Sequence, residues 1–173
     1  MTHHPGDDVT IRQARHGDGA GMWQVVHDCG VLDLNSAYLY MLQAHHFADT
    51  CAVATRGDRI VGLVTGHCPP TRPGAVFLWQ VGILPEVQGM GLGRQLVAAF
   101  LRLPGAEGAV RLETTVTPSN APSRALFSRI ASDLGAECQI SPFFGEAEFP
   151  QAGHEAEELF TIAPLDAEAI KHL

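Results

Sequence analysis

Three glycines at alternate positions, Gly89, Gly91 and Gly93, lie between an apolar stretch and a run with helical spacing. The apolar stretch ends at Pro85 and is typical of a buried strand, and the run from Gly91 to Leu103 predicts a helix. Glycines carry no Cβ, so backbone N–H groups at the helix start can converge on one anion, which the helix dipole also attracts. The pattern predicts a strand–turn–helix unit that binds a pyrophosphate.

Other phosphate-binding turns fit less well. A dinucleotide-binding fold places its glycines after the first strand of a βαβ unit, with an acidic ribose ligand about 20 residues later. Here about three predicted strands come first, and the next acid, Glu107, lies in a Pro/Gly-rich loop. No Gly-Lys-Ser/Thr is present, which excludes the phosphate loop of nucleotide hydrolases. Three glycines in an ordinary turn are the remaining alternative.

Length and charge limit the classes of partner. The 173 residues suffice for one domain with a real core, and the net charge of −8 argues against nucleic-acid binding and suits a cationic substrate. No apolar run approaches the length of a membrane span, so no membrane association is expected. The four cysteines are scattered, as is typical of reduced thiols in a cytoplasmic protein. The nine histidines lack ligand spacing, so no metal site is expected.

The apolar periodicity predicts alternating strands and helices along the chain. Strands are expected at Val9–Ala14, Thr50–Thr55, Arg59–Cys68, Ala75–Leu84, Val110–Val116, Ala136–Ser141 and Glu157–Ile162. Helices are expected at Asp18–Cys29, Ala37–Phe47, Gly91–Leu103 and Asn120–Leu134. We expect residues 1–8 to form a disordered tail, residues 9–163 a single domain, and residues 164–173 a frayed C-terminal tail.

The glycine turn also carries a family resemblance. Its pattern Gln-x-x-Gly-x-Gly, after a Val-x-Ile-x-Pro strand, resembles the acyl-CoA signature of the GCN5-related N-acetyltransferases (GNAT). The order of predicted elements, β-α-α-β-β-β-α-β-α-β-β, is that of the same family over essentially the whole chain. The resemblance implies an α/β fold with a central mixed, mostly antiparallel sheet. This sheet is splayed between the fourth and fifth strands and flanked by helices.

The resemblance further implies acetyl-CoA as cosubstrate, with its thioester between the splayed strands. The backbone of Val81 and Ile83 would pair with the pantetheine arm, and the segment from Gln88 to Arg94 would hold the pyrophosphate. Asn120 matches a family position near the pantetheine, although a plain helix N-cap is the alternative reading and the two roles are compatible. The expected cofactor-binding residues are Val81, Gly82, Ile83, Gln88, Gly89, Met90, Gly91, Leu92, Gly93, Arg94, Asn120, Ser123 and Arg124.

One position departs from the family pattern. Many members carry a tyrosine that protonates the leaving CoA thiolate, and Phe127 stands there in this chain. A phenyl ring donates no proton. The general acid is therefore expected to be another residue, with Tyr38 the best candidate, or water.

A closer resemblance rests on longer blocks spread along the chain: Asp33–Leu42, His46–Cys51, Trp79–Val81, Leu112–Pro118, Phe143–Phe144 and His154–Glu155. These blocks resemble the L-2,4-diaminobutyrate acetyltransferases, which catalyse the first committed step of ectoine synthesis. The resemblance implies transfer of an acetyl group to the γ-amine, giving N4-acetyl-L-2,4-diaminobutyrate for a compatible-solute pathway that serves osmoprotection. It also implies a homodimer, for which the Phe143–Phe144 segment is a plausible interface.

A diamino acid needs carboxylates for its ammonium groups and a cation or donors for its carboxylate. Asp33 and Glu113 are the candidate ammonium partners. Glu113 stands within an apolar and threonine-rich strand, where a carboxylate is rare unless it faces a ligand; a solvent-side or edge glutamate is the alternative. Trp79 on the central strand could face an ammonium group, or could be a core aromatic.

Tyr38 and Tyr40 point to different sides of their helix, so only one can line a pocket, and we choose Tyr38. His154 is expected to reach the substrate carboxylate from its own or a neighbouring subunit. The expected substrate-binding residues are Asp33, Asn35, Tyr38, Trp79, Glu113 and His154. The expected catalytic residues are Glu113, as a base acting directly or through water, Tyr38, and Asp33 as the second candidate base.

Two other functions remain open at the level of sequence. One is N-acetylation of a different small amine, such as a polyamine, an aminoglycoside or a protein terminus. The other is a non-catalytic acyl-CoA sensor, because binding alone would need the same glycines together with Gln88 and Arg94.

Overall fold

The computed structural model describes residues 8–150 and 152–173, so most of the expected N-terminal tail lies outside the described residues. The strands are β1 (Val9–Gln13), β2 (Cys51–Arg56), β3 (Arg59–His67), β4 (Ala75–Ile83), β5 (Arg111–Val116), β6 (Glu137–Phe144) and β7 (Glu157–Ala163). The helices are α1 (Gly19–Cys29), α2 (Ala37–His46), α3 (Leu92–Leu101), α4 (Ala121–Leu134) and α5 (Ala167–His172). Among the described residues, none of these helices is long and apolar enough to cross a membrane.

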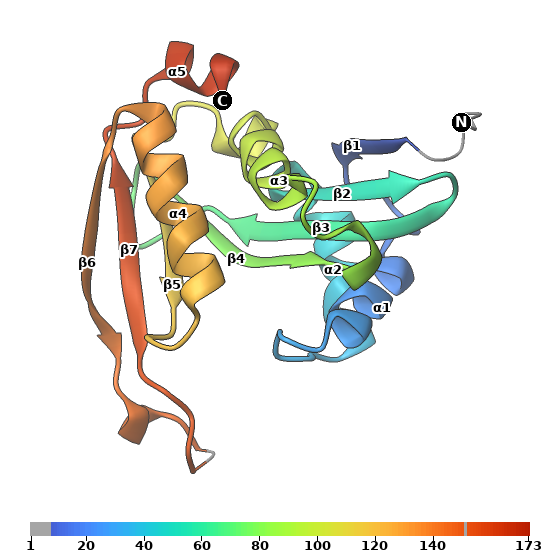
Figure 1. The fold of residues 1–173 in the computed structure, drawn as a ribbon, viewed down its shortest axis with the longest axis horizontal. Coiled ribbons are helices and arrows are strands. Elements are labelled where there is room, and N and C mark those ends of the chain that lie inside the picture. Colours follow the sequence, from blue (N-terminus) through green and yellow to red (C-terminus); the bar gives the residue numbers. More distant parts are fainter. Residues whose placement is uncertain (1–7, 151) are drawn as a thin grey trace. The chain divides into compact units, whose positions relative to one another are not determined.

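Hydrogen bonds place the strands in the order β1-β2-β3-β4-β5-β7-β6 (Figure 1). The pairs β1–β2, β2–β3, β5–β7 and β6–β7 are antiparallel. The parallel pair β4–β5 joins only Ala75–Phe77 to Arg111–Glu113, although β4 continues to Ile83. The predicted fold class, an α/β fold with a mixed and mostly antiparallel sheet, is confirmed.

The chain forms two compact units that share β4. Unit 1 comprises Met1–His67 and Trp79–Glu107, and unit 2 comprises Cys68–Leu78 and Gly108–Leu173. The glycine turn and the segment around Asp33 therefore belong to unit 1. Glu113, Asn120 and His154 belong to unit 2.

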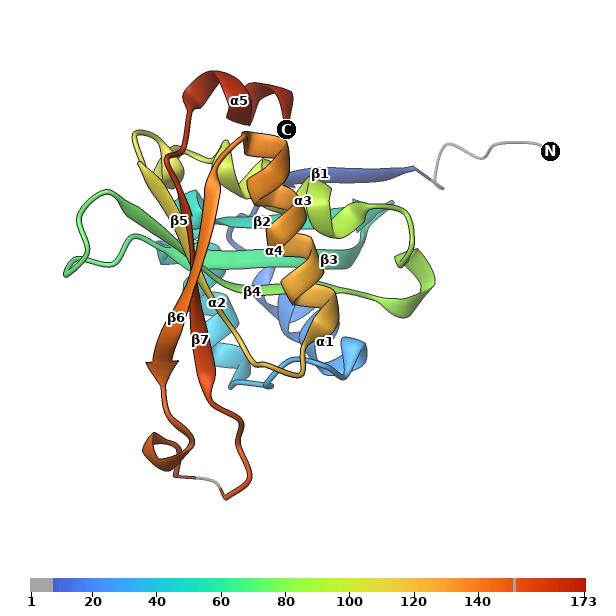
Figure 2. The same ribbon diagram turned by 60° about the vertical axis from the view of Figure 1, so that its left-hand side comes forward.

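Helices cover both faces of the unit 1 strands, because β2 and β3 consist largely of buried apolar residues with no polar face. Helix α1 contacts β3 and packs on α2, whereas α3 contacts β2 and β3. Figures 1 and 2 show α3 on one side of these strands and α1 and α2 on the other. Each helix buries an apolar stripe, which in α3 includes Leu92, Leu96, Val97 and Phe100.

In unit 2, α4 packs against β6 and β7 through a buried face that includes Phe127, Ile130 and Ala131 (Figure 2). Strand β6 is the last in the sheet order and is exposed along nearly all of its length. It extends to Phe144, beyond the predicted end at Ser141.

The prediction of a frayed C-terminal tail was wrong for Ala167–His172, which form α5. Asp166 caps this helix, because its carboxylate accepts a hydrogen bond from the backbone N–H of Ala169 at 2.8 Å. Helix α5 contacts α4, and Leu173 is only 8% exposed. Capping and burial together order a segment that is too short to be stable alone.

Candidate active site

The turn after β4 has the backbone conformation that its glycines suggest. The chain leaves β4 through a short 3-10 turn, Pro85–Val87, and then passes through Gly89 at φ +77° and Gly91 at φ +72°. These left-handed values are costly for residues with a Cβ, so glycine is required at both positions by backbone geometry. Gly91 immediately precedes α3, and the first helical hydrogen bond runs from the Gln95 N–H to the Gly91 carbonyl at 3.2 Å.

This turn fits a phosphate group. Within the described residues, no side chain caps the N-terminus of α3, so its first N–H groups need another hydrogen-bond acceptor. A Cβ added at Gly89 would meet no described heavy atom within 4 Å, and one at Gly91 would meet only Gln95 Nε2 at 4.0 Å. Arg94, half-buried in the first turn of α3, adds a positive charge to that of the helix dipole.

Strand β4 leads into this turn with two different faces. Val81 and Ile83 are half-buried and share one face, whereas Gly82 is buried on the other. A Cβ on Gly82 would lie 3.0 Å from Leu32 Cδ1, so this glycine lets the loop before α2 pack on the strand. Packing therefore explains Gly82, and its role at the cofactor stays a prediction.

In unit 2, Asn120 caps α4, because its Oδ1 accepts a hydrogen bond from the Ser123 N–H at 3.1 Å. Arg124 forms an ion pair with Glu158 of β7 and lies 5.1 Å from the centre of the Phe160 ring. The alternative reading of Asn120 as an N-cap is thus confirmed. The cofactor roles of Asn120, Ser123 and Arg124 stay predictions.

Phe127 is a core residue. Its side chain is 2% exposed, and its ring centre lies 6.4 Å from that of Phe160. The ring therefore contributes to core packing, and this position of the helix supplies no proton donor. Tyr38 and water therefore stay the candidates for the general acid.

Glu113 lies in an environment that the sequence alone does not predict. The residue is 1% exposed, and its two carboxylate oxygens accept hydrogen bonds from Arg72 at 2.7 Å each and from Arg111 at 2.9 Å. Burial by itself raises the pKa of Glu113, but the hydrogen bonds and charges of both arginines outweigh it, and the pKa is lowered. A carboxylate held in this way is a weaker base than expected, and its oxygens already have cationic partners.

Asp33 and Asn35 lie in the loop between α1 and α2, where their backbone carbonyls accept hydrogen bonds from side chains. The Asp33 carbonyl accepts hydrogen bonds from Gln80 Nε2 at 3.0 Å and from Asn35 Nδ2 at 3.2 Å. The Asn35 carbonyl accepts one from Trp23 Nε1 at 3.2 Å. Trp79, half-buried, precedes Gln80 on β4, so its side chain points to the opposite face of the strand from the Gln80 amide that holds Asp33.

Tyr38 and Tyr40 lie on different sides of α2, as the helical spacing predicts. Tyr38 is 67% exposed, whereas Tyr40 is fully buried. Tyr38 lines a cavity of about 340 Å³ with Met41, His16, His45 and His46. The choice of Tyr38 as the accessible tyrosine agrees with this burial, and its role in catalysis stays a prediction.

His154, in unit 2, is stacked on Phe149 with ring centres 3.7 Å apart. Its Nδ1 lies 2.7 Å from the Glu155 carbonyl oxygen. The neighbouring Glu155 side chain accepts hydrogen bonds from the backbone and hydroxyl of Ser119, just before α4. The segment that carries His154 is therefore attached to the start of α4.

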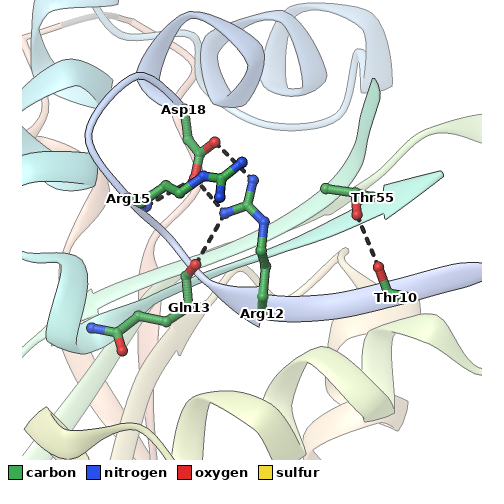
Figure 3. A network of polar contacts seen from close by, with 6 residues as sticks. All are labelled: Thr10, Arg12, Gln13, Arg15, Asp18 and Thr55. Carbon is green, nitrogen blue, oxygen red and sulfur yellow. Dashed lines mark hydrogen bonds and ion pairs between the residues drawn. The ribbon is translucent and has the colours of Figure 1, made fainter. Parts of the chain in front are cut away.

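Figure 3 shows a second polar cluster in unit 1, which includes Arg12, Arg15 and Asp18. These three residues also line another cavity, of about 390 Å³. Asp18 accepts two hydrogen bonds from Arg12, at 2.6 and 2.9 Å, and one from the Arg15 N–H at 2.8 Å. Burial raises the pKa of Asp18, but the hydrogen bonds and positive charges of Arg12 and Arg15 together lower it by more. The net shift of the pKa is therefore downward. Because Arg12 and Asp18 neutralise each other, the cluster fits a structural role at the start of α1.

The comparison with protein families shows to which family the chain belongs. The sequence pattern of the acetyltransferase (GNAT) family matches residues 21–131, which include the loop around Asp33, β4, the turn and most of α4. The chain belongs to the GNAT acetyltransferase family.

Two relatives within this family carry the same enzyme name. The L-2,4-diaminobutyric acid acetyltransferase of Shouchella clausii is 39% identical over 157 residues, which cover 91% of this chain and 88% of that enzyme. The enzyme of the same name from Bordetella parapertussis is 41% identical over 156 residues, covering 90% of this chain and 84% of that enzyme.

A solved GNAT structure is similar to this chain along nearly its whole length. It is diaminobutyrate acetyltransferase EctA from Paenibacillus lautus, in complex with its substrate L-2,4-diaminobutyric acid and coenzyme A. The TM-score is 0.87 at 34% sequence identity, and the match covers 91% of this chain and 96% of the other.

Three residues of this GNAT chain were missed by sequence reasoning: Arg72, Arg111 and Gln80. The two arginines lie in a loop and at the start of a strand, and only the fold brings Arg72 next to Glu113. Gln80 had a signal, because a polar amide in a buried strand between Trp79 and Val81 needs hydrogen-bond partners. Among the described residues, no group of three or more His, Cys, Asp or Glu side chains could hold a metal ion.

Proposed function

We propose that this chain transfers the acetyl group of acetyl-CoA to the γ-amine of L-2,4-diaminobutyrate, giving N4-acetyl-L-2,4-diaminobutyrate. The observation that carries the proposal is the relation to the P. lautus enzyme, which binds this diamino acid and coenzyme A and matches 91% of the present chain. The 39% identity to the S. clausii enzyme of the same activity supports it independently.

The turn at the start of α3 is the proposed site for the cosubstrate pyrophosphate. Its backbone N–H groups, the left-handed Gly89 and Gly91, and Arg94 supply an anion site of the required kind. The backbone of Val81 and Ile83 would hold the pantetheine arm. Bound there, acetyl-CoA supplies a thioester whose acetyl carbon accepts the amine.

The substrate amine must lose a proton before it can attack. With a lysine-like pKa near 10, deprotonation at pH 7 costs about 4 kcal/mol. Glu113 already holds two arginines, so we propose Asp33 as the ammonium partner and the stronger candidate base, acting directly or through water. Trp79, Asn35, Tyr38 and His154 remain proposed contacts to the substrate.

We further propose direct transfer in a ternary complex, without an acyl-enzyme. A cysteine nucleophile would have to be a thiolate, and burial raises the pKa of Cys51 to about 12. Burial also raises the pKa of Cys138. Direct transfer predicts intersecting lines in initial-velocity kinetics, whereas parallel lines with a trapped acetyl-cysteine would contradict it.

In this proposal the enzyme is a cytoplasmic homodimer whose product enters ectoine synthesis for osmoprotection. The apolar side chains of Ile140, Phe143 and Phe144, exposed on the edge strand β6, support a second copy as the partner. Sedimentation should give the mass of a dimer, and a Phe143→Ser, Phe144→Ser variant should shift it toward the monomer.

The activity itself is tested by release of CoA thiol with a panel of amines: diaminobutyrate, spermidine, an aminoglycoside and a peptide N-terminus. We expect diaminobutyrate to be the preferred acceptor. A preference for spermidine would replace the proposal with a different small-amine acetyltransferase. Binding of acetyl-CoA without turnover of any amine would indicate a sensor.

A further inference from the structure

The loop before α2 is fixed by buried side chains, although it has no regular secondary structure of its own. Gln80 Nε2 donates to the Asp33 carbonyl at 3.0 Å, and Trp23 Nε1 donates to the Asn35 carbonyl at 3.2 Å. Leu32 packs onto β4 at Gly82, where a Cβ would lie 3.0 Å from its Cδ1. Loop 31–36 is thus attached to α1 through Trp23 and to β4 through Gln80 and Gly82.

The attachment to β4 continues into the core. Tyr40 Oη donates to Gln80 Oε1 at 3.0 Å, and the side chains of both residues are almost completely buried. Because a phenol donates to the amide oxygen, the amide nitrogen must point the other way, toward the Asp33 carbonyl. Tyr40 therefore sets the orientation of the Gln80 amide, and the amide sets the position of the Asp33 backbone.

Burial makes this chain of hydrogen bonds stiff. Gln80 is 5% exposed and Tyr40 is 0% exposed, so water has little access to replace either partner. A buried polar group that loses its partner is costly, which strongly disfavours loop conformations that break the bond to Asp33.

We propose that Gln80 and Tyr40 are positioning residues for the acceptor substrate, because they hold loop 31–36 and Asp33 in one conformation before the substrate binds. This inference rests on the proposed function, in which Asp33 and Asn35 contact the diamino acid. It assigns acceptor selectivity in part to two residues that do not touch the substrate, on the side of β4 opposite to Trp79 and Val81.

The test uses Gln80→Met, which removes both bonds of the amide, and Tyr40→Phe, which removes only the hydroxyl. The matched control is Thr50→Val, which removes another buried hydrogen bond of unit 1, from Thr50 Oγ1 to the Gly66 carbonyl at 2.7 Å. We expect both loop variants to raise KM for diaminobutyrate about tenfold, with KM for acetyl-CoA unchanged. The control variant should change neither constant.

Two readouts are independent of activity. Hydrogen exchange of the backbone amides in loop 31–36 should become faster in Gln80→Met and Tyr40→Phe but not in Thr50→Val. The indole N–H signal of Trp23, one of two tryptophans in the chain, should shift in the ¹⁵N spectrum as its bond to Asn35 weakens, and a Trp23→Phe variant assigns it.

Loop exchange at the wild-type rate in Gln80→Met would overturn the inference. The inference would also be overturned if Gln80→Met and Tyr40→Phe impaired the use of diaminobutyrate and acetyl-CoA equally, and if Thr50→Val, at a similar loss of thermal stability, did the same. If the wild-type chain does not acetylate diaminobutyrate, the proposed function fails, and the exchange and indole readouts still decide whether Gln80 holds the loop.

Discussion

Glu113 illustrates why burial alone does not identify a catalytic acid or base. Its carboxylate is buried in β5, which raises its pKa, yet Arg72 and Arg111 compensate and keep it ionised. Arg72 belongs to the loop before β4, and its own pKa is raised chiefly by the hydrogen bond to Glu113. The three side chains therefore join this loop to β5 within unit 2.

The pH dependence of a Glu113→Gln variant separates a base from a structural anion. A lost base would be partly replaced at high pH, where free amine is more abundant. Because both oxygens of Glu113 are held by arginines, we expect a fractional loss of kcat/KM that is the same between about pH 7 and pH 9. Recovery of activity with rising pH would instead restore Glu113 as the base.

Stability toward acid should change in the same variant. A carboxyl whose folded pKa lies below its ordinary value of 4.5 stabilises the fold above that value, and this contribution is lost as pH falls through the folded pKa. Glu113→Gln should cost less than about 3 kcal/mol near pH 7, because both arginines reach solvent, and the cost should shrink below about pH 4. Thermal unfolding of wild type and Glu113→Gln from pH 7 to acid measures this loss of stability, with Glu107→Gln at an exposed position as control. A loss of stability that does not depend on pH would contradict a lowered pKa of Glu113.

The turn between β4 and α3 acts as one element. Its glycines serve two purposes, because Gly89 and Gly91 adopt left-handed backbone conformations and also leave the space above the helix start open. A substitution therefore mixes strain with loss of binding, and the two effects need separate controls.

Gly91→Val places a branched side chain at the N-terminus of α3, where we propose the pyrophosphate to bind. We expect calorimetry to show CoA affinity lowered at least about tenfold, because the chain fills the anion site and strains the backbone. Gly57→Val is the matched control, since Gly57 also has positive φ, at 57°, with open space around it, in the β2–β3 turn. That variant should lose stability and keep its CoA affinity; unchanged affinity in Gly91→Val would show that the turn does not hold the cofactor.

For the whole molecule, local patterns predicted most of the elements and the fold class. Within residues 8–150 and 152–173, apolar periodicity and the glycine turn located every strand and the four longer helices, because these depend on short-range spacing. Helix α5 was missed because its order depends on the Asp166 cap and on contact with α4.

The site was less predictable because its chemistry depends on contacts distant in sequence. The pairing of Arg72 with Glu113 spans 41 residues, and that of Tyr40 with Gln80 spans 40. Sequence alone could propose that a carboxylate or an aromatic group is important. It could not show that the charged carboxylate of Glu113 is already paired with two arginines, or that Tyr40 is buried against Gln80.

Acetylation of the γ-amine of a four-carbon diamino acid is best tested by comparing diaminobutyrate, ornithine and lysine as acceptors side by side. The position of the acetyl group on each product is read by NMR. An extra methylene displaces the nucleophile by about 1 Å, which can cost about 100-fold in rate. We predict N4-acetyl-L-2,4-diaminobutyrate as the product and kcat/KM for ornithine about 100-fold lower. Equal or faster turnover of ornithine, or acetylation at the α-amine, would contradict this account.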